Sequence, residues 1–231
     1  MSHKTVLRIA AAVSGLSGVV ILVGIFYPII SYNTTYSQNY SKLISPITEK
    51  SSSEAKVNEV DYTQASNWFQ GGAKKGDFVS SKVEYYNISV PRLKIDRALV
   101  AIGGEDLSKS IIQYPGTALP GKRGNAVLFG HSILPIFYNP KNYISIFSLL
   151  PTLKKGDDIE VDYDGVTYKY RVETMFEAHP TDIQVLDQDD SDSFLTLVTC
   201  VPPGDPGKPK RLIVRARVIP PDQMSYENSR N

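Results

Sequence analysis

The chain has 231 residues, of which 42% are hydrophobic and 21% charged, with a formal net charge of +1 at pH 7. This composition allows one globular domain with its own core, and the balanced charge gives no indication of nucleic-acid binding. One cysteine excludes an intramolecular disulfide and zinc sites built from several cysteines, and with three histidines a histidine-rich metal site is not expected either.

An apolar run without any charge occupies residues 9–30, directly after Lys4 and Arg8. A helix of this length rises roughly 33 Å, enough to cross a bilayer core. A cleaved signal peptide has a shorter apolar stretch and a small-residue cleavage site, whereas SYNTTY follows here. The sequence therefore predicts an uncleaved single-pass anchor in the plasma membrane, with residues 1–8 in the cytoplasm and the remainder outside. A buried core helix is the alternative, but the run offers no polar outer face.

Residues 31–80 are polar and have no sustained apolar period. This composition predicts a stalk or linker between the anchor and a folded domain. One short helical piece is expected over residues 61–69, where Trp68 and Phe69 could dock on the domain.

Residues 81–220 alternate apolar and polar and are rich in β-branched and aromatic residues, which is typical of strands. Asp-Gly at 164–165, between two alternating runs, predicts a two-residue hairpin. Apolar residues spaced three apart over 144–150 predict a short helix that ends at Pro151. The sequence therefore predicts one mainly β domain, most simply a closed barrel with short connecting helices, followed by a polar tail at 221–231.

Three side chains with acyl-transfer chemistry lie at the ends of predicted strands. Cys200 ends FLTLVTC, His131 follows NAVLFG, and Arg211 opens RLIV. Each has an ordinary alternative: a small buried thiol, a satisfied core histidine, and a surface arginine. Together they form a complete set, because a thiolate attacks carbonyls, an imidazole protonates leaving amines and a guanidinium stabilises an oxyanion. Gly130, just before the histidine, indicates a close backbone approach.

These motifs resemble the sortase family of membrane-anchored cysteine transpeptidases. The matching pieces are NAVLFGHS around the histidine, TLVTC around the cysteine, RLIV after it, and PGTALPGKRGN upstream of the histidine. The resemblance covers about residues 83–219, nearly the whole predicted β domain. It implies an eight-stranded β-barrel, protein substrates with an LPxTG-like sorting signal, and an amine acceptor such as a cell-wall peptide or a pilin lysine.

The resemblance also implies roles for individual residues. Cys200 would attack the threonine carbonyl of the sorting signal and form a thioester that the amine then resolves. His131 would act as general acid and base, and Arg211 as a clamp on the oxyanion or the substrate. Thr199 would line the substrate groove, and His179, in the segment before the cysteine strand, is expected to contact substrate rather than to replace the catalytic histidine.

Two other functions remain open from the sequence. A related thiol peptidase would use the same residues but pass its acyl group mainly to water. A non-enzymatic anchored barrel would bind surface partners and would keep Cys200 buried and unreactive.

No cofactor or metal is expected. The acidic run LDQDDSD, residues 186–192, could attract calcium, which some sortases use beside this segment. Its spacing lacks the glycine and the closing glutamate of an EF-hand loop, so a solvated turn is the better expectation. Residues 31–80 also lack the Asp-Pro-aromatic lid motif of many pilin-assembling sortases, and no second apolar anchor follows Ile219, which favours a general-purpose class.

Overall fold

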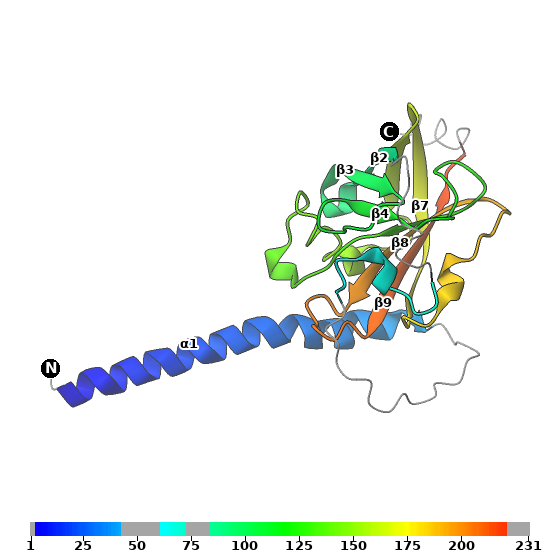
Figure 1. Cartoon of the computed structure of the whole chain (residues 1–231). Helices are drawn as coiled ribbons and strands as arrows, with labels where there is room; N and C mark the ends of the chain where they lie inside the picture. The colour runs from blue at the N-terminus through cyan, green and yellow to red at the C-terminus, as the bar shows by residue number, and fades with distance from the viewer. Residues whose placement is uncertain (1–2, 43–60, 73–83, 221–231) are drawn as a thin grey trace, which may run out of the picture.

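A computed structural model describes residues 3–42, 61–72 and 84–220 of the chain. A long helix, α1 (His3–Ser31), projects from a β-barrel that lies at its C-terminal end (Figure 1). The side chains of α1 are not buried against the protein, and the helix is long and apolar enough to cross a membrane. The predicted apolar span is thus one continuous helix.

Eight strands close into the barrel, as the sequence predicts. The strands are β2 (Glu84–Val90), β3 (Ile95–Ile102), β4 (Ile111–Gln113), β5 (Gly124–Phe129), β6 (Asp158–Tyr163), β7 (Val166–Ala178), β8 (Ser193–Val201) and β9 (Lys210–Val218). Their order is β7-β6-β2-β3-β4-β5-β8-β9, and β9 also pairs with β7, which closes the ring. The predicted hairpin is confirmed: Asp164 and Gly165 join β6 to β7 with φ of 50° and 74°, as a mirror-image turn requires.

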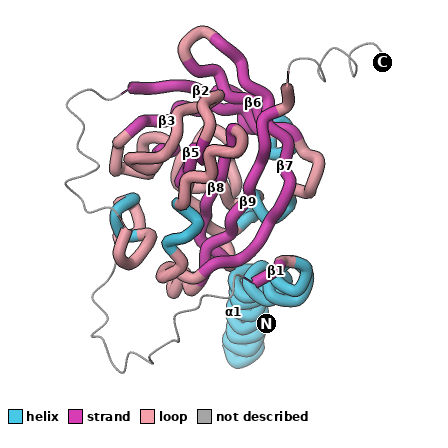
Figure 2. Tube along the Cα trace, turned by 90° about the vertical axis from the view of Figure 1, so that its right-hand side faces the viewer, coloured by secondary structure: helices cyan, strands magenta, loops and turns pink. Residues whose placement is uncertain are grey.

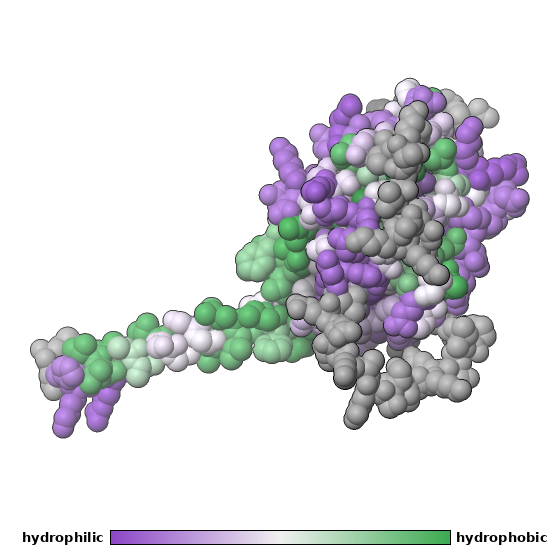
Figure 3. Space-filling view, in the orientation of Figure 1, coloured by the Kyte–Doolittle hydropathy of each residue, from purple (hydrophilic) through white to green (hydrophobic). Residues whose placement is uncertain are grey.

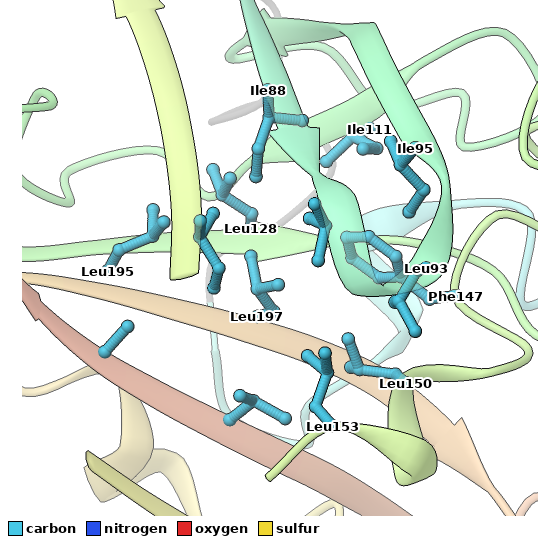
Figure 4. Close-up of a cluster of buried hydrophobic side chains, with 14 of the residues drawn as sticks. Ile88, Leu93, Ile95, Ile111, Leu128, Phe147, Leu150, Leu153, Leu195 and Leu197 are labelled. Atoms are coloured by element: carbon cyan, nitrogen blue, oxygen red, sulfur yellow. The ribbon is translucent and has the colours of Figure 1, made fainter. Parts of the chain in front are cut away.

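The barrel interior is filled by aliphatic side chains that alternate along the strands (Figure 4). On β8, Leu197 and Val201 face this interior, whereas Val198 and Cys200 belong to a second buried cluster on the opposite face. The two-residue period of a strand therefore decides which β8 side chains meet the core and which meet the outer face.

The short connecting helices are single turns. They are η3 (Ala65–Asn67), η5 (Pro91–Leu93), η6 (Pro135–Phe137), η7 (Leu150–Thr152) and η8 (Ile183–Leu186). The helix predicted over residues 144–150 is wrong: turns fill this stretch, and Pro151 lies inside η7. Backbone bonds between residues three apart hold these turns, as from the Ser148 amide to the Ser145 carbonyl at 2.9 Å, and the Ser145 hydroxyl donates to the Asn139 carbonyl at 3.1 Å.

Residues 31–42 are packed on the barrel, although the sequence indicates a polar stalk there. They form η1 (Tyr32–Tyr36), η2 (Ser37–Asn39) and β1 (Ser41–Lys42), which pairs in parallel with β7 beside the end of α1 (Figure 2). The hydroxyl of Tyr32 donates to Glu177 Oε1 at 2.8 Å, and that of Tyr40 to the Pro151 carbonyl at 2.7 Å. Tyrosines spaced four apart share one helix face, which explains this packing. The predictions for residues 43–60, 73–83 and 221–231 lie outside the described residues.

Candidate active site

Parallel pairing brings His131 and Cys200 to one edge of the barrel. β5 and β8 run in parallel and end together, with Phe129 opposite Val198. The amide of Gly130 then extends the ladder by donating to the Val198 carbonyl at 3.1 Å. His131, which follows Gly130, and Cys200, two residues after Val198, therefore lie beside each other at the same edge of the barrel.

The close approach predicted at Gly130 is present. A Cβ on this residue would stand 2.4 Å from the ring of Phe147. The same phenylalanine fixes the loop that follows, because its amide donates to the His131 carbonyl at 2.9 Å. Any side chain at position 130 would therefore displace the catalytic-histidine candidate from its place.

Arg211 reaches the site from the other side of the cysteine strand. β8 and β9 are antiparallel, and their register sets Cys200 directly opposite Arg211. The arginine is fully buried, and the structure gives it no carboxylate partner among the described residues. The thiol, the imidazole and the guanidinium predicted from the sequence thus converge at one strand edge, while their catalytic roles stay predictions.

Residues 61–72, which we call the strap, cover this edge (Figure 1). Ala65, Trp68 and Phe69 are buried in the same cluster as Cys200. The indole of Trp68 stacks on Phe129, with ring centroids 5.2 Å apart and planes 11° apart. The predicted docking of Trp68 and Phe69 is therefore present, and it leaves Cys200 only 2% exposed.

Backbone bonds attach the strap to the barrel on two sides. The amide of Ala65 donates to the Glu105 carbonyl at 3.1 Å, and the amide of Leu107 donates to Thr63 at 2.9 Å. On the other side, the amide of Gln70 donates at 2.8 Å to a carbonyl of the loop after β7. The strap is thus tied to the barrel by these bonds and by its buried side chains, and it contributes no strand to the closed ring.

The strap uses a carbonyl to engage Arg211. The Nε and Nη2 atoms of Arg211 donate to the Trp68 carbonyl at 3.2 and 3.0 Å, and Nη1 donates to the carbonyls of Lys208 and Lys210. The guanidinium also lies 5.3 Å from the ring centre of Tyr62. A carbonyl oxygen of the protein therefore occupies the donors that an oxyanion or a substrate carbonyl would need.

Burial leaves both reactive groups uncharged under the strap. Burial first, and then the charge of Lys208, lower the pKa of His131 to about 4. Burial also raises the pKa of the Cys200 thiol, against the opposing pull of the Arg211 and Lys208 charges. The Nε2 atom of His131 is buried and has no hydrogen-bond partner among the described residues. The covered site is thus a neutral thiol and a neutral imidazole with an unused ring nitrogen.

Thr199 and His179 do not join Cys200, His131 and Arg211 at the edge of the barrel. Thr199 is fully buried on the core-facing side of β8, where its hydroxyl donates to the Gly130 carbonyl at 2.8 Å. This contact supports the backbone just before His131, and contact with substrate stays a prediction. His179 is exposed at the end of β7, next to Ala178 of the buried cluster, and its role likewise stays a prediction.

The acidic run makes ion pairs and turns. Asp189 pairs with Arg215 at 3.2 Å, and Asp192 lies 3.5 Å from Arg217. Among the described residues, no group of three or more His, Cys, Asp or Glu side chains is arranged to hold a metal ion. The expectation about calcium stays a prediction.

Sequence reasoning missed what the strap does to the site. It predicted that Trp68 would dock, but not that a backbone carbonyl of this segment would bind Arg211. The signal in the sequence was the pair of large aromatic residues, Trp68 and Phe69, inside an otherwise polar segment. The Asp-Pro-aromatic pattern is absent, yet Tyr62 and Trp68 still cover the arginine.

Comparison with known proteins agrees with this geometry. A family model for the sortase domain matches residues 88–219, which is more than half of the chain. The chain belongs to the sortase family. Sortase A of Streptococcus agalactiae serotype III (strain NEM316) is 26% identical over 132 residues, which cover 57% of this chain and 51% of that protein. This sortase therefore spans about half the length of that curated relative.

Solved sortase structures share the fold. Sortase C-1 from Actinomyces oris is 28% identical with a TM-score of 0.51, covering 58% of this chain and 73% of its own. A lid mutant of sortase A from Corynebacterium diphtheriae is 26% identical with a TM-score of 0.52, covering 63% and 76%. A Clostridium perfringens sortase D5 transpeptidase is 25% identical with a TM-score of 0.50, covering 59% and 79%.

Proposed function

We propose that this sortase is a single-pass, membrane-anchored cysteine transpeptidase that cleaves an LPxTG-like sorting signal and attaches the protein carrying it to a cell-surface amine. One observation carries the proposal: Cys200 on β8, Arg211 on β9 and His131 just after the end of β5 meet at one edge of the barrel. Folding of the barrel does not require a buried arginine beside a buried cysteine and a histidine, whereas acyl transfer needs all three groups together.

In the proposed reaction, the Cys200 thiolate attacks the threonine carbonyl carbon of the sorting signal. Arg211 stabilises the oxyanion, and His131 protonates the leaving glycine amine as the peptide bond breaks. A thioester remains on Cys200. The acceptor amine attacks it while His131 takes a proton from that amine, which releases the Cys200 thiolate, forms the new amide bond and restores the protonated His131.

Substrate entry requires the strap to leave. One of the similar structures is a lid mutant of another sortase, and we assign the same kind of cover to residues 61–72 here. Release of the Trp68 carbonyl frees two donors of Arg211. Water then solvates His131 and Cys200, so the pKa of His131 rises toward its ordinary range and the Arg211 charge favours the thiolate.

The anchor completes the proposal. Lys4 and Arg8, in the first turns of α1 ahead of its apolar run, favour a cytoplasmic amino terminus, and the barrel then lies outside the membrane. Residues 32–36 continue in helical form and pack on the barrel, so the chain after the apolar run offers no extended cleavage site. The anchor is therefore retained in the working protein.

The test is a ligation assay on the full chain in detergent or vesicles. An LPxTG-type peptide and an oligoglycine amine are incubated with the native protein and with Cys200→Ala, and products are identified by mass spectrometry. A ligated product that is lost in the variant supports transpeptidation. Cleavage without ligation at any amine concentration assigns a hydrolase instead, and cleavage that persists in Cys200→Ala overturns the catalytic assignment.

A further inference from the structure

Two adjacent apolar side chains stand exposed in the loop that follows His131. Ile136 is 74% exposed and Phe137 is 63% exposed, more than any other large apolar side chain in the described part of the barrel. We call these two residues the apolar tip. Soluble surfaces seldom expose neighbouring large apolar groups without a contact that covers them.

The tip lies beside the C-terminal end of α1, where the apolar run meets the barrel. A groove of about 220 Å³ separates helix and barrel, and it is lined by Tyr27, Pro28 and Ser31 on one side and by Pro135 and Leu149 on the other. Pro135 directly precedes the tip. Figure 3 shows green side chains on the part of the barrel that overhangs the green length of α1. The tip is therefore level with the last turn of the apolar run.

The barrel is held in this position by several contacts. Tyr32 donates to Glu177, which also pairs with Lys210 at 2.7 Å. Tyr40 donates to a carbonyl of η7, and β1 extends the sheet at β7. With α1 continuing without a break into these contacts, the direction of the helix fixes the orientation of the barrel. A helix that spans the bilayer thus places the tip at a defined depth.

The residues around the tip have the chemistry of a membrane interface. Tyr138 follows the tip, and its hydroxyl donates to the carbonyl of Leu93. On both sides of Leu93, the segment RLKIDR (92–97) carries three basic residues and one acidic residue, and Lys141 is exposed further along the loop. An apolar tip with tyrosine and basic neighbours matches the boundary between acyl chains and headgroups.

We propose that Ile136 and Phe137 insert into the surface of the bilayer that α1 crosses, as a second membrane contact of this sortase. The proposal rests on the anchor proposed above and goes beyond it, because it adds a direct contact between the barrel and the lipid. Pro203, three residues after Cys200, lines the same groove as Pro135. The contact therefore sets the loops after His131 and Cys200 at a fixed height above the lipid.

The experiment uses the full chain in vesicles of phosphatidylglycerol and phosphatidylcholine. Cys200→Ser removes the native thiol, and one new cysteine is introduced at a time and labelled with an environment-sensitive fluorophore: Ile136→Cys at the tip, Val166→Cys in the β6–β7 hairpin on the far side from α1 (Figure 1), or Leu22→Cys in α1. Lipids that carry a nitroxide near the headgroup or deep in the chain serve as quenchers. Circular dichroism checks that each variant is folded.

The expected result is quenching of position 136 by the shallow nitroxide, quenching of position 22 by the deep one, and no quenching of position 166. Quenching at 22 but not at 136 overturns the proposal and leaves the anchor in place. No quenching at 22 overturns the anchor and the tip together. Equal quenching at 136 and 166 also overturns the proposal, because the barrel would then lie on lipid without a preferred face.

A second readout avoids the fluorophore. Position 136 is more exposed than position 166, which is 48% exposed, so a charged maleimide should modify it faster in the absence of lipid. In vesicles the order should reverse, because lipid covers the tip and not the hairpin. An unchanged order contradicts insertion. Protection of position 136 only after a sorting peptide is added would assign the tip to substrate and overturn the proposal as well.

Discussion

Replacement of Trp68 by alanine should uncover the active site while leaving the barrel folded. The indole is fully buried, stacks on Phe129, and donates through Nε1 to the Tyr62 carbonyl at 2.8 Å. Loss of a buried tryptophan costs about 3–5 kcal/mol. The loss falls on the docking of the strap, since the strap contributes no strand to the closed ring. The open fraction should therefore rise roughly 100- to 4,000-fold, because each 1.4 kcal/mol is tenfold.

Cys200 reports this opening directly, because it is the only cysteine of the chain and is buried under the strap. The rate of its modification by a maleimide at pH 7.5 should rise by the same factor in Trp68→Ala. Gln70→Ala is the matched control, since its exposed side chain lies on the same strap and its backbone bond is retained. Thermal unfolding of both variants verifies the barrel. An unchanged modification rate in folded Trp68→Ala would refute the reasoning.

Three further predictions follow from the same contacts. Arg211→Lys should lower kcat/KM for peptide transfer by roughly 10²–10³-fold, because an ammonium cannot offer the paired donors of a guanidinium, and an unaffected rate would remove Arg211 from the mechanism. Acid should loosen the strap. The pKa of His131 is about 4 when the strap covers it and near its ordinary value of about 6.5 when the strap is open. Protonation of His131 therefore favours the open state below about pH 6.5, and this destabilises docking of the strap by at most about 3 kcal/mol near pH 4. The urea midpoint for the red shift of Trp68 fluorescence should accordingly fall between pH 7 and pH 5, and His131→Asn should abolish the dependence; a midpoint that does not move contradicts it. Tyr32→Phe should lower the Tm by roughly 3–10 °C, because a buried bond to a carboxylate is lost, whereas an unchanged Tm would mean that the anchor segment is not part of the folded unit.

The barrel and its site could be predicted because their signals are local. Alternation gives strands, Asp-Gly at 164–165 gives the hairpin, and reactive side chains at strand ends give the candidate site. The same alternation also predicts which way Thr199 faces relative to Cys200. Thr199 and Cys200 are neighbours on one strand and must face opposite sides, which explains why the threonine reaches the Gly130 carbonyl and not the thiol face.

Other features depend on partners far apart in the chain. In the sequence, Tyr32 and Tyr40 belong to a polar stalk, because their partners, Glu177 and the Pro151 carbonyl, lie more than 100 residues away along the chain. The bond between Arg211 and the strap is harder still to predict, since its acceptor is a backbone carbonyl and every residue has one. The sequence therefore indicates which side chains can react, but not which backbone atoms form hydrogen bonds with those side chains when no substrate is bound.

The most direct test of the central claim is the intact mass of the acyl-enzyme. Full-length Trp68→Ala protein is mixed with a library of LPxTG-like peptides that varies the third and fourth positions, without added amine, and quenched in acid. The account predicts a thioester adduct on Cys200 with the mass of the peptide fragment up to the fourth residue of the motif, absent in the Cys200→Ala double variant and released by an added amine. Complete modification of Cys200 by a maleimide together with no adduct from any peptide would contradict it.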